Sequence, residues 1–371
     1  YTTEKENMSM NHEEIEEMLI PLRDYEKSCR EIYLANPEAF RNVVWNWEEF
    51  KERFRATDHS GYALGEEPPV FMGNLLTEQD CFENESIEAT VILHDRYAPP
   101  FYHNLKFIKI VYALRGGCRF FVQDKTQDRE TVLNEGDFVI IPPEMNQAVF
   151  TGEEDAVTVN IILKRSTFGD SFYSLLLEND SISDFFWQML YSKGSNRALV
   201  VRCGKDERLR SIVLDMCGEG LFCRKGAPAG GNLMMKGYVM LLFGWTLKAH
   251  QQKMEDVGSI SASEAVLPVM IRYIRENYTT VTLTSVAKHF GKSEGYLSRY
   301  IRRETGKTFR FLLKEFRMKQ AANMIENSTC NMEEVAEAIG YSDISCFYRN
   351  FKESFGCTPQ QYRNKRNRVS L

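Results

Sequence analysis

The feature that most constrains this chain is an internal repeat near its C-terminus. The stretch VAKHFGKSEGYLSRYIRRETG, from Val286 to Gly306, aligns with VAEAIGYSDISCFYRNFKESFG, from Val335 to Gly356. In each copy, apolar residues four positions apart are followed by a glycine and then by a second apolar periodic run. Each copy is therefore predicted to be a helix-turn-helix unit, in which Gly291 and Gly340 adopt the left-handed conformation that ends the first helix.

The second helix of each copy has a start signal and one apolar face. Ser293 and Asp343 stand where an N-cap is needed, because their side-chain oxygens can accept from the first free backbone N–H groups. Apolar residues at four-residue spacing then define the side that packs on a core. The predicted buried stripe consists of Leu297, Ile301, Phe347 and Phe351.

A predicted linker helix joins the two copies. The segment from Thr308 to Ser328 has apolar residues at helical spacing, and a helix of this length spans on the order of 27–30 Å. That approaches the ~34 Å between successive major grooves on one face of B-DNA, so a rigid linker could present both second helices to adjacent grooves. After the second copy, Thr358, Pro359 and Gln361 form a capping-box start for another helix.

The charge of the chain is unevenly distributed. The formal net charge is -6, yet the segment from Ala265 to the end has 18 Lys and Arg against 10 Asp and Glu, an excess of +8 that leaves −14 for the preceding residues. A basic module on an acidic body indicates an anionic partner for the module alone. The alternative is that these basic side chains form an ordinary solvated helix face.

The segment from about Ala265 to Arg363 resembles the C-terminal DNA-binding domain of the AraC/XylS family of bacterial transcription regulators. The stretches that carry the resemblance are YLSRYIRRETGKTF, AANMIENS and VAEAIGYSDISCFYRNFKESFGCTPQQYR, at their observed spacing. The resemblance implies double-stranded DNA as a partner, with the exposed early positions of each second helix facing base edges. These positions are Gly295, Ser298, Arg299, Ser345, Cys346, Tyr348 and Arg349.

Arg299 and Arg349 are the best candidates for base readout, because a guanidinium fork can pair with guanine O6 and N7. Gly295 has no side chain where relatives can place a base-reading residue, so we expect the first unit to specify less sequence. Basic residues one turn later are expected to meet phosphates, which adds salt-dependent affinity without sequence choice. These residues are Arg302, Arg303 and Lys352.

From about Thr90 to Leu163, short β-rich runs alternate with turn residues such as Gly116-Gly117 and Glu135-Gly136-Asp137. This pattern predicts a small antiparallel barrel or sandwich, and it resembles the cupin-type effector domain of many members of the same family. The predicted fold class is multidomain α+β: an N-terminal cupin-like antiparallel β-barrel with flanking helices, followed by a C-terminal all-α double helix-turn-helix domain.

Metal-dependent cupins carry three His and one Glu as ligands at fixed positions around the glycine turn. The matching positions here hold His103, Leu105, Lys109 and Gln147, so one ligand of four is present. A divalent metal needs three or more N or O ligands, and an ammonium group would repel it. We expect no metal, no cofactor and no catalytic residue; the alternative is a cupin isomerase or oxygenase fused to a DNA-binding domain.

A ligand pocket is the remaining hypothesis for the β-rich domain. His103, Leu105, Phe107 and Lys109 alternate onto one strand face. If this face lines the barrel interior, His103, Phe107 and Lys109, together with Gln147, could bind a small polar or anionic metabolite such as a sugar derivative. The alternative is that the face is partly solvated at the barrel mouth.

Helical periodicity is predicted over residues 168–178, 182–191, 206–216 and 233–252. The last segment is apolar around most of its circumference, which favours a homodimer helix, as the family resemblance also implies. The predicted domains are an N-terminal helical segment 1–60, a cupin-like sensing barrel 61–165, a helical dimerisation region 166–254, a linker 255–264 and the DNA-binding domain 265–371.

The nine cysteines include no CxxC pair, which is typical of a reducing compartment. The first residues lead into an acidic stretch rather than an apolar leader, and no apolar run approaches the ~20 residues of a membrane helix. We expect a cytoplasmic protein, bound to DNA and not to membranes. A third functional alternative is a regulator without a small ligand, controlled by a protein partner through the acidic surface.

Overall fold

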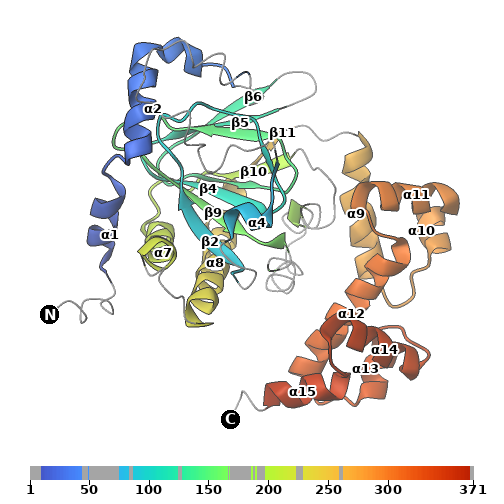
Figure 1. Ribbon diagram of the computed structural model, residues 1–371. Coiled ribbons are helices and arrows are strands. Elements are labelled where there is room, and N and C mark those ends of the chain that lie inside the picture. The colour runs from blue at the N-terminus through green and yellow to red at the C-terminus, as the bar shows by residue number, and fades with distance from the viewer. Residues whose placement is uncertain are drawn as a thin grey trace. The chain divides into compact units, whose positions relative to one another are not determined.

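A computed structural model (Figure 1) describes residues 10–43, 49, 75–82, 87–123, 128–165, 167, 185–186, 189, 197–222, 229–258 and 262–367. The chain divides into two compact units: residues 1–183 with 194–260, and residues 184–193 with 261–371. Each unit is described by itself.

The N-terminal unit is built on two antiparallel sheets. One sheet has six strands in the order β11-β10-β7-β4-β9-β2, and the other has three in the order β6-β5-β8. The strands are β2 (Ala89–Leu93), β4 (Ile108–Arg115), β5 (Cys118–Val122), β6 (Arg129–Leu133), β7 (Phe138–Ile141), β8 (Gln147–Phe150), β9 (Val157–Leu163), β10 (Arg197–Val201) and β11 (Met254–Gly258).

Apolar side chains from the two sheets form a common core. Val111 of β4 and Val139 of β7 pack in one buried cluster with Phe120 and Val122 of β5. Since successive side chains of a strand point to opposite faces, the alternating pattern places one face of each sheet in this core. The predicted fold class, an antiparallel β domain with flanking helices followed by an all-α domain, is confirmed.

The turn between β6 and β7 requires glycine. Gly136 has φ +88°, and a Cβ on it would lie 1.7 Å from the carbonyl oxygen of Gly204, closer than any side chain can stand. Its N–H donates to the carbonyl oxygen of Ala113 at 2.8 Å. The hydrogen bond to Ala113 holds the β6–β7 turn against β4.

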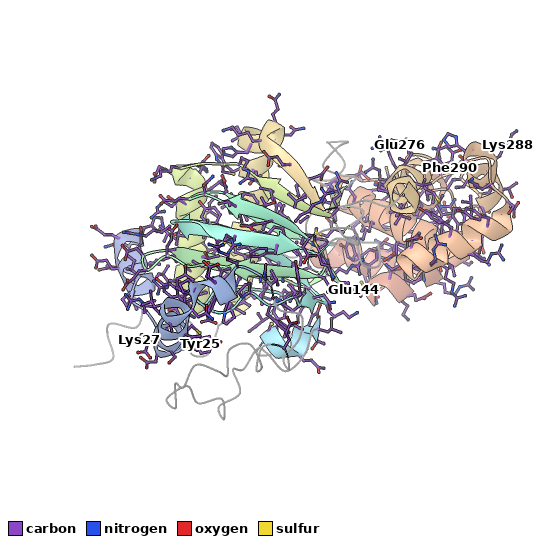
Figure 2. The ribbon with its side chains drawn as sticks, turned by 90° about the horizontal axis from the view of Figure 1, so that it is seen from above. Tyr25, Lys27, Glu144, Glu276, Lys288 and Phe290 are labelled. Atoms are coloured by element: carbon purple, nitrogen blue, oxygen red, sulfur yellow. The ribbon has the colours of Figure 1, made fainter. Side chains whose placement is uncertain are left out.

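The N-terminal helices α1 (His12–Leu19) and α2 (Asp24–Ala35) and the 3-10 helix η2 (Pro37–Phe40) flank the sheets (Figure 1). On α2, Lys27 points outward (Figure 2), whereas Glu26 is buried. Arg96 Nε and Nη2 each donate to a Glu26 oxygen at 3.0 Å. This buried two-point pair fastens α2 to the loop that follows β2.

Two further helices pack on each other beside the sheets: α7 (Glu207–Cys217), continued by the π-helical turn η4 (Gly218–Phe222), and α8 (Ala229–His250), continued by the 3-10 turn η5 (Gln251–Lys253). Asp206 caps α7 and also accepts from Trp245 Nε1 and His250 Nε2 of α8, at 3.0 and 2.7 Å. The short strands β1 (Leu75–Leu76) and β3 (Asn104–Leu105) pair in parallel, and α4 (Glu78–Cys81) follows β1.

Strands β1, β8 and β11 were not predicted from the sequence. β11 occupies the first part of the predicted linker 255–264, so the linker prediction is wrong there. Its backbone pairs with β10 from Val201 opposite Met254 to Arg197 opposite Gly258, and Arg197 Nε donates to Asp256 Oδ1 at 2.6 Å. The predicted helix 168–178 lies outside the described residues, and the predicted helix 182–191 is described at only three positions.

The C-terminal unit is helical. Its helices are α9 (Ala262–Glu276), α10 (Leu283–His289), α11 (Glu294–Thr305), α12 (Phe309–Asn327), α13 (Met332–Ala338), α14 (Ile344–Phe355) and α15 (Pro359–Asn367). The predicted linker helix is confirmed as α12. The predicted capping box at the start of α15 is also present, with Thr358 N donating to Gln361 Oε1 at 3.0 Å and Gln361 N to Thr358 Oγ1 at 3.3 Å.

Candidate nucleic-acid interface and effector pocket

The second helix of the first repeat unit, α11, has one face in the core and one in solvent. Its N-cap is Ser293, which accepts from Tyr296 N, as predicted. Leu297 and Ile301 are buried, and the opposite face is polar. The exposed residues on it include the predicted positions Gly295, Ser298, Arg299, Arg302 and Arg303.

The second helix of the second unit, α14, follows the same design. Its N-cap is Asp343, which accepts from Ser345 N at 2.8 Å, and Phe347 and Phe351 are fully buried. The Nη2 of Arg349 lies 3.6 Å from Cys346 Sγ, on the exposed side. The predicted positions that are exposed on α14 are Ser345, Arg349 and Lys352.

Three predicted DNA-contacting residues have other contacts within the unit. Cys346 and Tyr348 are half-buried, and the Tyr348 ring meets Phe347 edge-on at 5.7 Å between centroids. Arg303 donates from Nε to Glu304 Oε1 at 2.7 Å and lies over the Tyr300 ring. Arg303 would therefore have to exchange a local partner for a phosphate, whereas Arg299 has no ion pair among the described side chains.

Sequence reasoning overlooked an aromatic and basic pair at the start of α11. Tyr296 is 43% exposed, and the Lys292 ammonium lies 5.7 Å from the centroid of its ring. Both residues precede Arg299 on the solvent side of the turn. The available signal was a Lys and a Tyr four positions apart, with the Tyr three positions before the arginine.

The turn of the second unit is anchored by the segment that precedes α10. Gly340 has φ +84°, and a Cβ on it would lie 2.1 Å from the carbonyl oxygen of Thr279; Gly291, its counterpart, has φ +61° and open space around it. Arg317 of α12 donates to the carbonyl oxygens of Tyr278 and Thr279 at 2.8 and 2.9 Å. These contacts fix the position of the turn that leads into α14.

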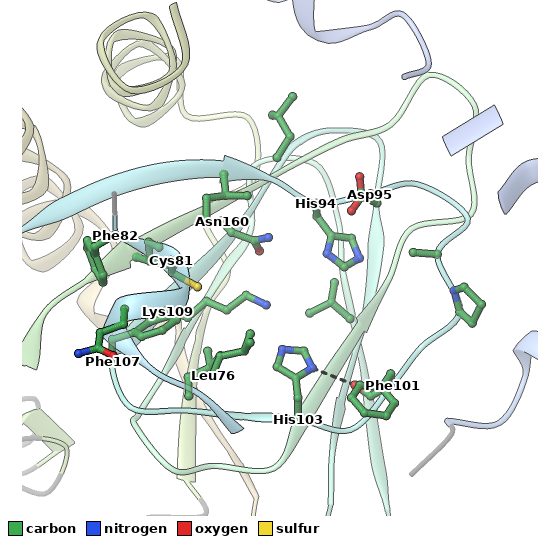
Figure 3. Close-up of a pocket in the computed structure, with 18 residues that line it drawn as sticks. Leu76, Cys81, Phe82, His94, Asp95, Phe101, His103, Phe107, Lys109 and Asn160 are labelled. Carbon is green, nitrogen blue, oxygen red and sulfur yellow. Dashed lines mark hydrogen bonds between the residues drawn. The ribbon is translucent and has the colours of Figure 1, made fainter. Parts of the chain in front are cut away.

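The N-terminal unit contains a cavity of about 430 Å³ (Figure 3). Three of the predicted ligand-binding residues, His103, Phe107 and Lys109, line it. The fourth, Gln147, is fully buried and hydrogen-bonds through Nε2 to His103 Nε2 at 2.8 Å. The structure therefore brings all four predicted residues to one place, three on the cavity wall and one behind it.

The contacts of His103 fix its tautomer. Its Nδ1 lies 3.0 Å from the carbonyl oxygen of Phe101, which can only accept. The proton is therefore on Nδ1, and Nε2 accepts from the Gln147 amide. Burial, reinforced by the charge of Lys109, lowers the pKa of His103 to about 3, so this ring is neutral at pH 7.

Lys109 is the charged group of the cavity. It lies on β4, is 6% exposed, and extends its side chain into the cavity between Asn160 and Leu76 (Figure 3). Burial lowers the pKa of Lys109 to about 8, so in most molecules the Lys109 side chain is still charged at pH 7. The side-chain ammonium of Lys109 makes no ion pair or hydrogen bond with the described residues.

Several cavity residues were missed by the sequence analysis. His94 follows β2, Asn160 comes from β9, and Leu76, Cys81 and Phe82 come from β1, α4 and the residue after it. These positions are far apart in sequence, and only the strand pairing brings them together. The polar residue Asn160 inside the apolar run VTVNIIL was the available signal.

Two further searches apply to the described residues alone. No group of three or more His, Cys, Asp or Glu side chains in these ranges is placed to hold a metal ion. No helix in the same ranges has both the length and the apolar composition needed to cross a membrane.

Comparison with known proteins places the C-terminal unit in a family. A helix-turn-helix domain family matches residues 286–365. The Msm operon regulatory protein of Streptococcus mutans is 26% identical over 108 residues, which are 29% of this chain and 39% of that protein. The matched stretch thus spans about two fifths of that relative's length.

Other similarities are longer or closer. The transcriptional activator RhaR of Salmonella choleraesuis is 24% identical over 300 residues, covering 79% of this chain and 97% of that protein. The solved C-terminal domain of AraT, a response regulator from Geobacillus stearothermophilus, is 34% identical over 29% of this chain and 89% of that domain, with a TM-score of 0.27. By its paired helix-turn-helix units and these sequence similarities, the C-terminal unit is a DNA-binding domain of the AraC/XylS type.

Proposed function

We propose that the chain binds DNA sequence-specifically and that Arg299 and Arg349 read bases. The observation that carries this proposal is the matched position of the two arginines, each exposed on a second helix whose opposite face is buried. Neighbouring polar positions would set the register and contact phosphates. The other proposed DNA-contacting residues are Gly295, Ser298, Arg302, Arg303, Ser345, Cys346, Tyr348 and Lys352.

The test for this part is recovery and sequencing of the DNA fragments bound to the full chain in its source cell. A shared motif with two half-sites about one helical turn apart is the expected result. Substituting Arg299 should relax bases in one half-site, and substituting Arg349 should relax bases in the other. Fragments with no common sequence would refute sequence-specific binding.

We propose that the cavity binds a small polar effector and that the effector changes DNA binding. Support comes from a preformed cavity of about 430 Å³ with buried polar groups, and from relatives named for sugar operons, such as the Xylose operon regulatory protein of Escherichia coli. The effector can shift the arrangement only by its difference in affinity between two states. A sugar or a sugar derivative is the class that those names suggest.

We also propose a homodimer formed through α8. Four large apolar side chains on this helix are 41–72% exposed in the single chain, a pattern that favours a buried interface. Light scattering should give a dimer mass, and a Met240→Glu, Leu241→Glu double variant should give a monomer. The exposed residues are Leu233, Met234, Met240 and Leu241.

We infer that the chain is a regulator and not an enzyme, because the cupin ligand positions hold one histidine, a leucine, a lysine and a glutamine. Stoichiometric iron, manganese or zinc in protein purified without added metal would favour the enzyme. For the effector, a ligand at a hundred times its dissociation constant should add about 2.7 kcal/mol to the stability of the chain. If no compound of a broad metabolite library raises the melting temperature of the chain, control by a protein partner would be favoured.

A further inference from the structure

Within the part of the chain that the structure describes, the cavity of the N-terminal unit holds a cation, Lys109, without a counter-ion. Lys109 is 6% exposed, and the acidic side chain on the cavity wall, Asp95, is already paired with Arg23 at 2.9 Å between Oδ1 and Nη2. A buried ammonium that lacks a partner is strongly unfavourable. An anionic ligand would supply the missing partner.

Two more polar atoms of the cavity walls, His94 Nε2 and Asn160 Oδ1, are buried and have no hydrogen-bond partner among the described residues. Burial, together with the charges of Lys109 and His103, lowers the pKa of His94 to about 3, so this ring is neutral at pH 7. Asn160 Oδ1 can only accept. A hydroxyl group on the ligand would donate to it, so the cavity is suited to one anionic group and one hydroxyl.

Most of the other wall residues are apolar, although Gln79, Asp95 and His103 also line the cavity. Leu76, Phe82, Leu105, Phe107 and Ile162 form one packed cluster and all line the cavity. A sugar ring placed against this cluster would leave several hydroxyl groups without hydrogen-bond partners, which is unfavourable. A hydrocarbon body placed there would instead be stabilised by the removal of its apolar surface from water.

We propose that the effector is an organic monocarboxylate with an apolar body and a hydroxyl group. Its carboxylate accepts from the Lys109 ammonium, its hydroxyl donates to Asn160 Oδ1, and its hydrocarbon part packs against Leu76, Phe82 and Phe107. This inference rests on the proposed role of the cavity as the effector site, and it narrows the ligand class to an acid.

The test is calorimetric titration of the full chain at pH 7 with 3-hydroxyoctanoate and 4-hydroxyphenylacetate, with their neutral amides, and with D-xylose and D-glucose. The acids should bind at least tenfold more tightly than the matched amides. Lys109→Met should abolish this preference, whereas Lys106→Met should keep it, because Lys106 lies outside the cavity wall and is paired with Glu144.

A second measurement guards against misfolding of the variant. Because Lys109→Met removes an unpaired buried charge and nearly keeps the side-chain volume, its melting temperature without ligand should equal or exceed that of the parent chain. A lower melting temperature would show that Lys109 has a structural partner and would overturn the proposal.

The remaining outcomes separate this inference from the proposed function. If a neutral sugar binds and changes DNA binding while the acids do not bind, the acid class is refuted and the small-molecule regulator stands. If the acids and amides bind equally, or if Lys109→Met leaves the preference intact, the role of Lys109 is refuted. If acids, amides and sugars all fail to bind, the inference is again refuted, and the DNA fragments recovered from the cell still test the regulator.

Discussion

Gly340 offers a sharp test of how the second helix-turn-helix unit is held. In Gly340→Ala, the new Cβ would lie 2.1 Å from the carbonyl oxygen of Thr279, at a residue with φ +84°. Gly291→Ala is the matched control, since Gly291 stands at the same point of the first unit, with φ +61° and nothing within 4 Å of the added Cβ.

The expected free energies follow from the contacts. Each alanine has to adopt the left-handed conformation, at about 1–2 kcal/mol. At position 340 the backbone must also move away from Thr279, whose carbonyl oxygen accepts from Arg317 at 2.9 Å. Loss of this charge-assisted hydrogen bond adds about 1.5–3 kcal/mol. We expect Gly340→Ala to destabilise its unit by roughly 3–5 kcal/mol in all and Gly291→Ala by roughly 1–2 kcal/mol.

Amide hydrogen exchange on the full chain measures these local free energies. A difference of about 2 kcal/mol corresponds to roughly thirtyfold faster exchange, and it should appear in α13 and α14 of Gly340→Ala. Gly291→Ala should accelerate exchange in α10 and α11 by a smaller factor. Equal acceleration in the two variants would refute the idea that the contact with Thr279 distinguishes the two turns.

Three further perturbations test the site and the fold. Arg349→Ala should weaken binding to the cognate site by ~1–3 kcal/mol and relax the preference at one base position. Lys352→Ala should weaken binding to all sequences alike and lower the slope of log affinity against log salt concentration by about 1. Equal losses of affinity on cognate and random DNA for Arg349→Ala would show that it does not read a base. Burial opposes ionisation of Glu26, but hydrogen bonds from Arg96 and Arg23 outweigh it and lower its pKa from 4.5 to about 2. A lowered pKa stabilises the folded state above pH 4.5, and this effect is lost as the pH falls toward 2. In urea unfolding at pH 7, Glu26→Gln should therefore be about 3 kcal/mol less stable than the parent chain, and this difference should shrink in acid. A difference that does not depend on pH would contradict this. Asp343→Ala should cost ~1 kcal/mol through loss of the α14 N-cap and Asp343→Asn much less, as measured by amide exchange in α14; equal effects would exclude capping.

Features encoded locally were predictable from the sequence. The caps Ser293 and Asp343 and the buried Phe347 depend on residues within one or two turns of a helix, so their pattern is visible in the chain itself. The two-residue alternation also predicted that His103, Phe107 and Lys109 would face one side, and all three line the cavity although residues 106 and 107 form a bend between β3 and β4. What these side chains meet across the cavity is not encoded in that period.

Features that depend on distant pairing were not predictable. Glu26 and Arg96 are 70 positions apart, and nothing near either residue marks the other as its partner. β11 was mistaken for a linker because Glu255 and Asp256 interrupt any apolar alternation and none of its side chains is fully buried, as suits an edge strand that pairs with β10. Asn160 faces the cavity because β9 pairs with β2 and β4, an arrangement that the sequence of β9 does not specify.

The contacts of Tyr278 and Thr279 also bear on the order in which the C-terminal unit can fold. These residues precede the first repeat copy in sequence. Their carbonyl oxygens nevertheless accept hydrogen bonds from Arg317, which lies 39 positions after Tyr278 and 38 after Thr279. Thr279 also contacts Gly340. Closing such long loops is entropically unfavourable, so these contacts should form late, after the local helices. A fragment that begins after residue 280 would keep the whole second copy and still lack the backbone that positions its turn. Duplication of the sequence has therefore produced two similar units, of which the second is completed by residues outside the repeat.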